Sequence, residues 1–338
     1  MRCRYQYCAK KVFSLGESAT NGCLIRAEFR LFEELAAQAV GWELDFCQFS
    51  RATAPFFLEQ VAGSSVVISR AVLPARFYQR GAVAPGYRTV SLLATGVGPQ
   101  SWRWCGESVT PHSLLVMPLA GDFESVSSAG LDTLHLTLPI ALLSDVAERH
   151  FDQPLHRLMP DERGFCANGG APLLRLRQLL AQYAPGQVAT QRASYPPFAA
   201  LVEREMAYLV LACLQASQVR EPVVPRGKRW LVLDRAVREI TAAQGSSMSV
   251  AQLASVAGAS RRTLENAFRD VLGVSPATYI KALKLHRLNR ALLHSDASLI
   301  GVAELGRLHG FRHLGQLAAD YRVAFGELPS ATLQRQPE

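Results

Sequence analysis

Short apolar runs separated by turn residues recur between residues 44 and 139. They are rich in Val, Phe, Tyr, Leu and Trp, and Pro or Gly punctuates them at intervals typical of an all-β domain. This spacing predicts a β-sandwich or barrel, and a helix is expected before it, from about Glu28 to Gly41. The runs are LDFCQF (44–49), FFLEQV (56–61), SVVISRAVL (65–73), ARFYQRG (75–81), YRTVSLLAT (87–95), SWRWCG (101–106), SLLVMPL (113–119), GDFESVS (121–127) and LDTLHLTLP (131–139).

Beyond Pro139 the apolar residues recur at i, i+3 and i+4, which predicts helices. The segments are IALLSDVAERHF (140–151), APLLRLRQLLAQY (171–183) and PPFAALVEREMAYLVLACLQAS (196–217). The third is the best candidate for a dimer interface, and packing against its own domain is the alternative. The residues available for that burial are Leu201, Tyr208, Leu209 and Leu211.

The segment QVREPVVPRGKR (218–229) mixes prolines, a glycine and charges without periodicity, as linkers do. We therefore divide the chain into an N-terminal extension (1–27), a β-rich effector or dimerisation domain ending in helices (28–220), a linker (221–228) and an all-helical domain (229–338). The predicted fold class is α+β.

The helical domain contains a duplicated pattern. A helix capped by Ser249 is followed by a Gly-containing turn and a second helix capped by Ser260, with Leu264, Phe268 and Leu272 on one face. After a longer helix from Pro276 to Leu293 the pattern recurs, and both second helices end in Gly-x-x-Pro. A pair of short helices around such a turn is a helix-turn-helix, so we expect two units joined by the long helix.

These residues resemble the AraC-type (AraC/XylS) family of bacterial transcription regulators over about residues 229 to 335. The resemblance implies a DNA-binding domain of two helix-turn-helix units, and an N-terminal domain similar to β-rich, cupin-like sensory domains followed by dimerising helices. Leu317 stands where the family usually has Phe. The residues that carry the resemblance are Gly310-Phe311, Leu317, Tyr321, Phe325-Gly326 and Pro329.

In the first unit the exposed face of the second helix is expected to lie in the major groove. Arg262 is suited to guanine, Asn266 to adenine and Glu265 to cytosine. Arg261 and Arg269 suit phosphates. A solvated charged face is the alternative for this run.

In the second unit the matching face carries Arg312, His313, Gln316, Ala318 and Ala319. The two alanines are suited to thymine methyl groups, and the polar residues to phosphates or one base edge. Simple surface exposure is the alternative for His313. Family members often have a basic or polar residue in place of Ala319, so we expect the first helix to specify the sequence and the second mainly to position the protein.

The charge distribution supports a nucleic-acid partner. Residues 226–338 contain 16 Lys and Arg against 9 Asp and Glu, whereas the first 225 residues contain 20 against 19. The connecting helix adds Lys281, Lys284, Arg287 and Arg290. Such asymmetry is typical of a DNA-binding module joined to a neutral domain, although Lys284 and Arg287 are equally suited to pairing with acidic neighbours.

The N-terminal domain shows no clustered His and carboxylate ligands and no nucleophile or paired-carboxylate motif, so we expect no metal, no cofactor and no enzymatic activity. GVGPQS at Gly96 is interpreted as a tight turn. Aromatic residues of the strands line either a pocket or a plain core. If an anionic effector binds, the candidates are Arg76, Arg80, Arg88, Trp102 and Trp104.

The N-terminus lacks the continuous apolar core of a signal peptide, so we expect a cytoplasmic protein with no membrane partner. The expected partners are double-stranded DNA, a small-molecule effector, a second copy in a homodimer and, for an activator, RNA polymerase. The alternative is a constitutive DNA-binding regulator whose N-terminal domain only dimerises. An enzyme with an auxiliary DNA-binding module ranks behind both.

Overall fold

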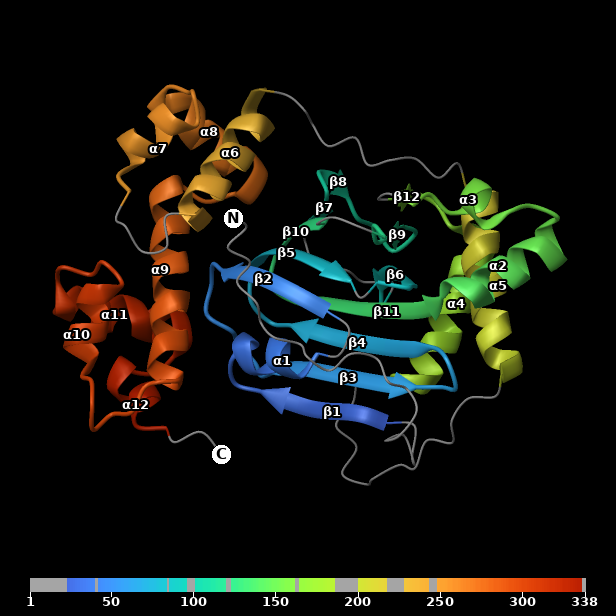
Figure 1. The fold of residues 1–338 in the computed structure, drawn as a ribbon, viewed down its shortest axis with the longest axis horizontal. Helices are drawn as coiled ribbons and strands as arrows, with labels where there is room; N and C mark the ends of the chain where they lie inside the picture. Colours follow the sequence, from blue (N-terminus) through green and yellow to red (C-terminus); the bar gives the residue numbers. More distant parts are fainter. Residues whose placement is uncertain are drawn as a thin grey trace.

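A computed structural model describes residues 23–39, 42–83, 85–95, 101–119, 123–161, 164–185, 200–217, 228–242 and 248–335. Strands and helices of the N-terminal part form one region, and the C-terminal helices form a second region against it (Figure 1). The predicted linker (221–228) and the predicted turn GVGPQS (96–101) lie outside the described residues, apart from Lys228 and Ser101.

The larger of two antiparallel sheets has seven strands. Successive side chains of its strands point to opposite faces, so that Leu92 packs with the helices of the N-terminal region and Leu93 packs toward the second sheet. In spatial order the strands are β1 (Cys23–Phe29), β3 (Phe56–Ala62), β4 (Val67–Leu73), β11 (Leu131–Pro139), β6 (Tyr87–Leu93), β9 (Leu114–Val116) and β12 (Gly164–Cys166).

The second sheet has five strands and faces the first across an aromatic core. Helix α1 (Phe32–Gln38) closes one side of this core with Phe32 and Leu35. The strands, in spatial order, are β2 (Trp42–Gln48), β5 (Phe77–Val83), β10 (Phe123–Ser127), β7 (Trp102–Trp104) and β8 (Glu107–Ser108).

Each of the nine predicted apolar runs overlaps a strand, and the all-β section ends at Pro139 as predicted. The helix expected from Glu28 is wrong at its start, because Glu28 belongs to β1, where it pairs with Phe57 of β3. That pairing joins segments distant in sequence, which local periodicity does not report. Strands β1, β8 and β12 were not predicted; β8 and β12 are too short to show a period.

Four helices pack against one face of the seven-stranded sheet, and Figure 1 shows them together on the side of the sheets away from the C-terminal helices. They are α2 (Ile140–Phe151), α3 (Leu155–Leu158), α4 (Gly170–Tyr183) and α5 (Ala200–Ala216). The α5 residues proposed for a dimer interface divide into two sets. Leu209 and Leu211 are buried in their own domain, whereas Leu201 is 77% and Tyr208 42% exposed.

The C-terminal region is helical throughout its described part, as predicted. The long helix α9 runs between two groups of shorter helices (Figure 1), and each group has its own apolar core. The helices are α6 (Lys228–Ala242), α7 (Val250–Val256), α8 (Arg261–Leu272), α9 (Pro276–Leu293), α10 (Val302–Leu308), α11 (Leu314–Phe325) and α12 (Pro329–Leu333).

Local sequence sets the ends of these helices. The Ser249 and Ser260 hydroxyls accept hydrogen bonds from the backbone N–H groups of Gln252 and Thr263, which confirms both predicted caps. Gly273 and Gly326 end α8 and α11 at φ +64° and +79°, a conformation that favours glycine. The proline three residues after each glycine opens the next helix, α9 or α12.

Candidate nucleic-acid interface

Helix α8 has one buried face and one basic face. Leu264, Ala267, Phe268 and Leu272 are buried, and Arg261, Arg262 and Arg269 are exposed. Glu265 and Asn266, between the two faces, are partly exposed. All five polar residues predicted from the sequence therefore have solvent-accessible side chains on one short helix.

The arginines of α8 differ in what they contact. Arg261 Nε donates to Glu265 Oε1 at 3.0 Å, an exposed i, i+4 pair. Arg262 and Arg269 make no hydrogen bond or ion pair with any described residue. Two guanidinium groups are thus open to an external acceptor. Arg261 must first break its weak ion pair with Glu265 before it can bind such an acceptor.

The matching face of α11 is less basic. Arg312, His313 and Ala319 are exposed, and His313 is the N-cap residue without a side-chain capping bond. Gln316 Nε2 donates to Asp320 Oδ1 at 3.2 Å. Asp320 Oδ1 also accepts a hydrogen bond from Lys281 Nζ of α9 at 3.0 Å. An acidic group therefore lies within this face and neutralises part of its charge.

Helix α9 adds positive charge beside α11. Burial, followed by the neighbouring charges of Arg312 and Arg287, lowers the pKa of Lys284. Burial and Arg287 likewise lower the pKa of His309. Cations that depress the pKa of one another lie close together, and such a group attracts an anion. Arg287 also donates from Nη2 to the carbonyl of Ile240 at 3.3 Å. A contact of Lys284 or Arg287 with DNA stays a prediction.

The β-rich region lies against the C-terminal ends of α8 and α11. Arg76 donates to the carbonyl groups of Leu272 and Gly273, at the C-terminal end of α8. A Cβ added to Gly326, at the end of α11, would lie 3.1 Å from the Arg51 guanidinium. Cations at helix C-termini interact favourably with the helix dipole. The N-terminal region therefore binds the C-terminal end of α8 and lies close to that of α11, and the basic face of α8 stays exposed.

A second candidate site is a cavity of about 70 Å³ between the two sheets. Trp102 and Trp104, two of the predicted effector residues, line it, together with Phe32, Trp42 and Phe123. None of its described lining residues is charged. The remaining polar groups are serines, threonine, Gln79 and His135.

The arginines predicted beside Trp102 and Trp104 lie elsewhere. Arg76 contacts α8, and Arg80 Nη1 lies 4.0 Å from Asp234 Oδ1 of α6. Arg88 is buried and donates to the carbonyl of Asp161 at 3.2 Å and to that of Pro160. The two tryptophans are therefore separated from the three arginines, because the latter engage backbone and carboxylate groups outside the cavity.

His135 is the titratable group of the cavity. Its Nδ1 lies 2.6 Å from Ser91 Oγ and its Nε2 lies 3.0 Å from Thr133 Oγ1. Burial lowers the pKa of this imidazole to about 4, so the ring is neutral near pH 7. The cavity is therefore an uncharged environment.

The described residues contain no group of three or more His, Cys, Asp or Glu side chains placed to hold a metal ion. No helix among them combines the length and apolar character needed to cross a bilayer.

Comparison with known proteins concerns the C-terminal region. The family described as a helix-turn-helix domain matches residues 253–335. The XylDLEGF operon transcriptional activator of Pseudomonas putida is 37% identical over 102 residues, which are 30% of this chain and 32% of that protein. A probable thc operon regulatory protein of Rhodococcus erythropolis is 34% identical over 90 residues, 27% of each chain. The chain thus matches about a third or less of the length of these relatives.

Among solved structures, a probable AraC family transcriptional regulator from Rhodopseudomonas palustris is 32% identical over 31% of this chain and 98% of that chain, with a TM-score of 0.30. Like the sequence matches, this similarity covers about a third of the present chain. The residues that match the helix-turn-helix family, 253–335, include α8, α9 and α11.

Proposed function

We propose that the chain, whose C-terminal third is an AraC-type helix-turn-helix DNA-binding domain, is a sequence-specific transcription regulator. The observation that carries this proposal is the exposed basic face of α8, where Arg262 and Arg269 have no described partner. Helices presented in this way in helix-turn-helix domains enter the major groove. The regulator would act in the cytoplasm.

The two helix-turn-helix units would contribute unequally. Arg262, Asn266 and Glu265 of α8 suit base edges, and Arg269 suits a phosphate. Asp320 of α11 is already paired with Gln316 of the same helix and with Lys281 of α9. This unit would therefore mainly position the protein, through Arg312 and the adjacent Lys284. Ala318 and Ala319 leave room for thymine methyl groups. The 18-residue α9 is about 27 Å long, which suits two units on one face of the duplex.

The N-terminal region would be the cupin-like sensory part, with an effector in the cavity between the sheets. The cavity is apolar and carries a few polar groups, the usual composition of small-molecule sites. A bound effector would change the contacts between the two regions and thereby the affinity for DNA. In an activator, RNA polymerase would be the further partner.

A constitutive regulator whose N-terminal region only dimerises is the second candidate. It is favoured by the exposure of Leu201 and Tyr208 on α5, which suits a homodimer interface. Both candidates share the DNA-binding role, and they differ in whether a small molecule changes the affinity.

The test is genome-wide mapping of the DNA bound by the full-length protein, followed by salt titration of binding to the best site. A sharp motif and a steep salt dependence are expected of a specific regulator. Diffuse binding without a motif, in the presence or absence of cell extract, would contradict sequence-specific regulation. A set of regulated genes that responds identically with and without small molecules would favour the second candidate.

A further inference from the structure

Helix α1 has two faces with different neighbours. Phe32, Leu35 and Ala39, at helical spacing, line the cavity between the sheets. Glu33 and Glu34, on the other side of the same helix, contact the DNA-binding region. One seven-residue helix thus lies between the effector cavity and the DNA-binding domain.

The Glu33 side chain contacts the middle of α9. Its Oε1 lies 2.9 Å from His286 Nδ1, and the two side chains are 5% and 7% exposed. The backbone N–H of Gln48 donates to His286 Nε2 at 3.0 Å. Because Nε2 accepts, the proton of the neutral imidazole is on Nδ1 and is donated to the Glu33 carboxylate. His286 is therefore fixed by one hydrogen bond from β2 and one to α1.

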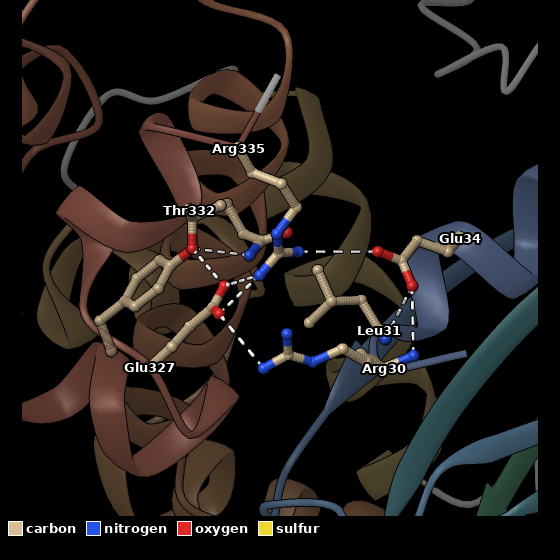
Figure 2. A network of polar contacts seen from close by, with 8 residues as sticks. Arg30, Leu31, Glu34, Glu327, Thr332 and Arg335 are labelled. Atoms are coloured by element: carbon tan, nitrogen blue, oxygen red, sulfur yellow. Dashed lines mark hydrogen bonds and ion pairs between the residues drawn. The ribbon is translucent and has the colours of Figure 1, made fainter. Parts of the chain in front are cut away.

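Glu34 meets the second helix-turn-helix unit (Figure 2). Its Oε1 lies 3.6 Å from Arg335 Nη1, and Arg335 in turn binds Glu327 at 2.5 Å. Glu327 accepts a hydrogen bond from Thr332, whose hydroxyl accepts one from Tyr321 at 2.9 Å. This network connects α1 to α11 and α12 through buried and half-buried polar groups.

The cavity behind α1 sets conditions on its occupant. Its volume of about 70 Å³ is less than half of the roughly 150 Å³ of an engineered cavity that binds benzene. A molecule with an aromatic ring therefore fits only if one wall moves. Trp104 lines the cavity, and its Nε1–H is buried without a hydrogen-bond partner among the described residues. An acceptor oxygen would satisfy it.

We propose that an uncharged, ring-sized apolar molecule with one hydrogen-bond acceptor occupies this cavity, displaces α1 and releases the Glu33–His286 and Glu34–Arg335 contacts. This inference rests on the proposed function, because it names the ligand class and the coupling route for the effector site. The ligand is uncharged since no described lining residue carries a charge and burying an unpaired ion is unfavourable.

Helix α1 is the wall that can move. The other walls are strands, and backbone ladders fix their positions. A helix of seven residues has little stability of its own. Its N-terminus is capped from within the helix, by Glu34 Oε2, which accepts hydrogen bonds from the backbone N–H groups of Arg30 and Leu31 at 3.2 and 3.3 Å. Displacing α1 leaves the backbone ladders of both sheets intact. It breaks side-chain contacts, among them those of Phe32 with the core rings Phe46, Phe56 and Phe77, and the ring of the ligand would replace these.

The ligand class is tested on the full chain with acetophenone and benzoate, which have similar size and differ in charge. Quenching of tryptophan fluorescence measures binding near pH 7.5. Acetophenone is expected to bind at least about tenfold more tightly, and Trp104→Phe to weaken it about tenfold. Trp102→Phe is the matched control, because Trp102 Nε1 already donates to Ser125 Oγ at 2.8 Å. Failure of acetophenone to bind, equal binding of benzoate, or an unaffected Trp104→Phe variant would overturn this ligand class.

The coupling is tested by the rate at which diethyl pyrocarbonate modifies His286, mapped by mass spectrometry. His286 is buried, and the exposed His313 of the same domain is the internal standard. Saturating acetophenone, and Glu33→Ala without ligand, are each expected to raise the relative rate about tenfold. Glu33→Gln, which retains an acceptor oxygen, should change it little.

Two outcomes separate this inference from the proposed function. An unchanged rate at His286 with acetophenone bound overturns the coupling, even if DNA affinity responds to the ligand by another route. A faster rate at His286 with unchanged DNA affinity supports the coupling through α1 and overturns effector control of DNA binding.

Discussion

Replacement of Arg262 by alanine tests how α8 reads DNA. Arg262 is the second residue of α8; its side chain is exposed and makes no contact with another described residue that the change would remove. Alanine also preserves the helix. A change in DNA affinity therefore reports the contact with DNA, and stability should stay within about 0.5 kcal/mol of the wild type.

The structure sets the expected magnitude. A guanidinium that pairs with both guanine acceptors contributes about 1–3 kcal/mol of discrimination, and about 1.4 kcal/mol is tenfold in affinity. Arg262 gives up no partner on binding, so we expect the specific site to weaken at least about tenfold. Arg261 first leaves Glu265, a pair of about 0.3–0.5 kcal/mol, and contacts phosphate. Arg261→Ala should therefore weaken all sequences alike and reduce the salt slope by about one.

The assay is fluorescence anisotropy on the mapped site and on a scrambled duplex, from about 50 to 200 mM salt. Arg322→Ala, an exposed arginine in the last turn of α11, is the matched control and should bind like the wild type. Ala319→Arg should lose little affinity for the mapped site, because the second helix-turn-helix unit mainly positions the protein. Normal operator binding by Arg262→Ala, or an equal loss on both duplexes, would refute base reading by this residue.

Three further predictions concern stability. The pKa of His135 is about 4 in the fold and about 6.5 when unfolded, so the unfolded chain binds the proton more readily. The contribution of His135 to the free energy of unfolding is therefore complete above pH 6.5 and falls as the pH drops toward 4. Since the ring keeps some solvent contact, urea unfolding should show that the free energy of unfolding falls by about 1–3 kcal/mol over this pH range. His135→Gln should lack this part of the pH dependence. Parallel plots of unfolding free energy against pH for the two proteins would contradict the prediction. Tyr321→Phe, which removes the hydroxyl bonded to Asn289 and Thr332, should lower stability by about 1–3 kcal/mol, whereas an unchanged urea midpoint would mean that water replaces the network. Gly273→Ala should destabilise by about 1–2 kcal/mol, from its left-handed backbone and the displaced Arg76 side chain, and an unchanged melting temperature would argue against both causes.

Local chemistry predicted much of the DNA-binding region. Ser249 and Ser260 cap their helices, and Gly273 and Gly326 end theirs, because capping and left-handed turns depend on the few residues involved. The strand runs were equally readable, because each is a short run rich in β-branched, aromatic and other apolar residues between turn residues. Both signals lie within a dozen residues of sequence, so no tertiary information was needed.

The candidate sites were less predictable because they depend on distant partners. Arg76 was expected beside Trp102 and instead binds the end of α8, almost two hundred residues later in the chain. The surroundings of Lys284 likewise came only from the structure, which places Arg312 and Arg287 near it. Side-chain identity fixes what a group can bind, and only its neighbours fix what it does bind.

The sequence by itself determined most of the helices and strands, the duplicated helix-turn-helix pattern and the basic face of α8, because each follows from short-range periodicity and charge. Tertiary structure decided the rest. It added β1 to the sheet, enclosed an uncharged cavity around Trp104, and brought Glu33 against His286 across 253 positions of the chain. These features arise from contacts between residues far apart in sequence, and the energy of such contacts depends on packing that no local pattern encodes.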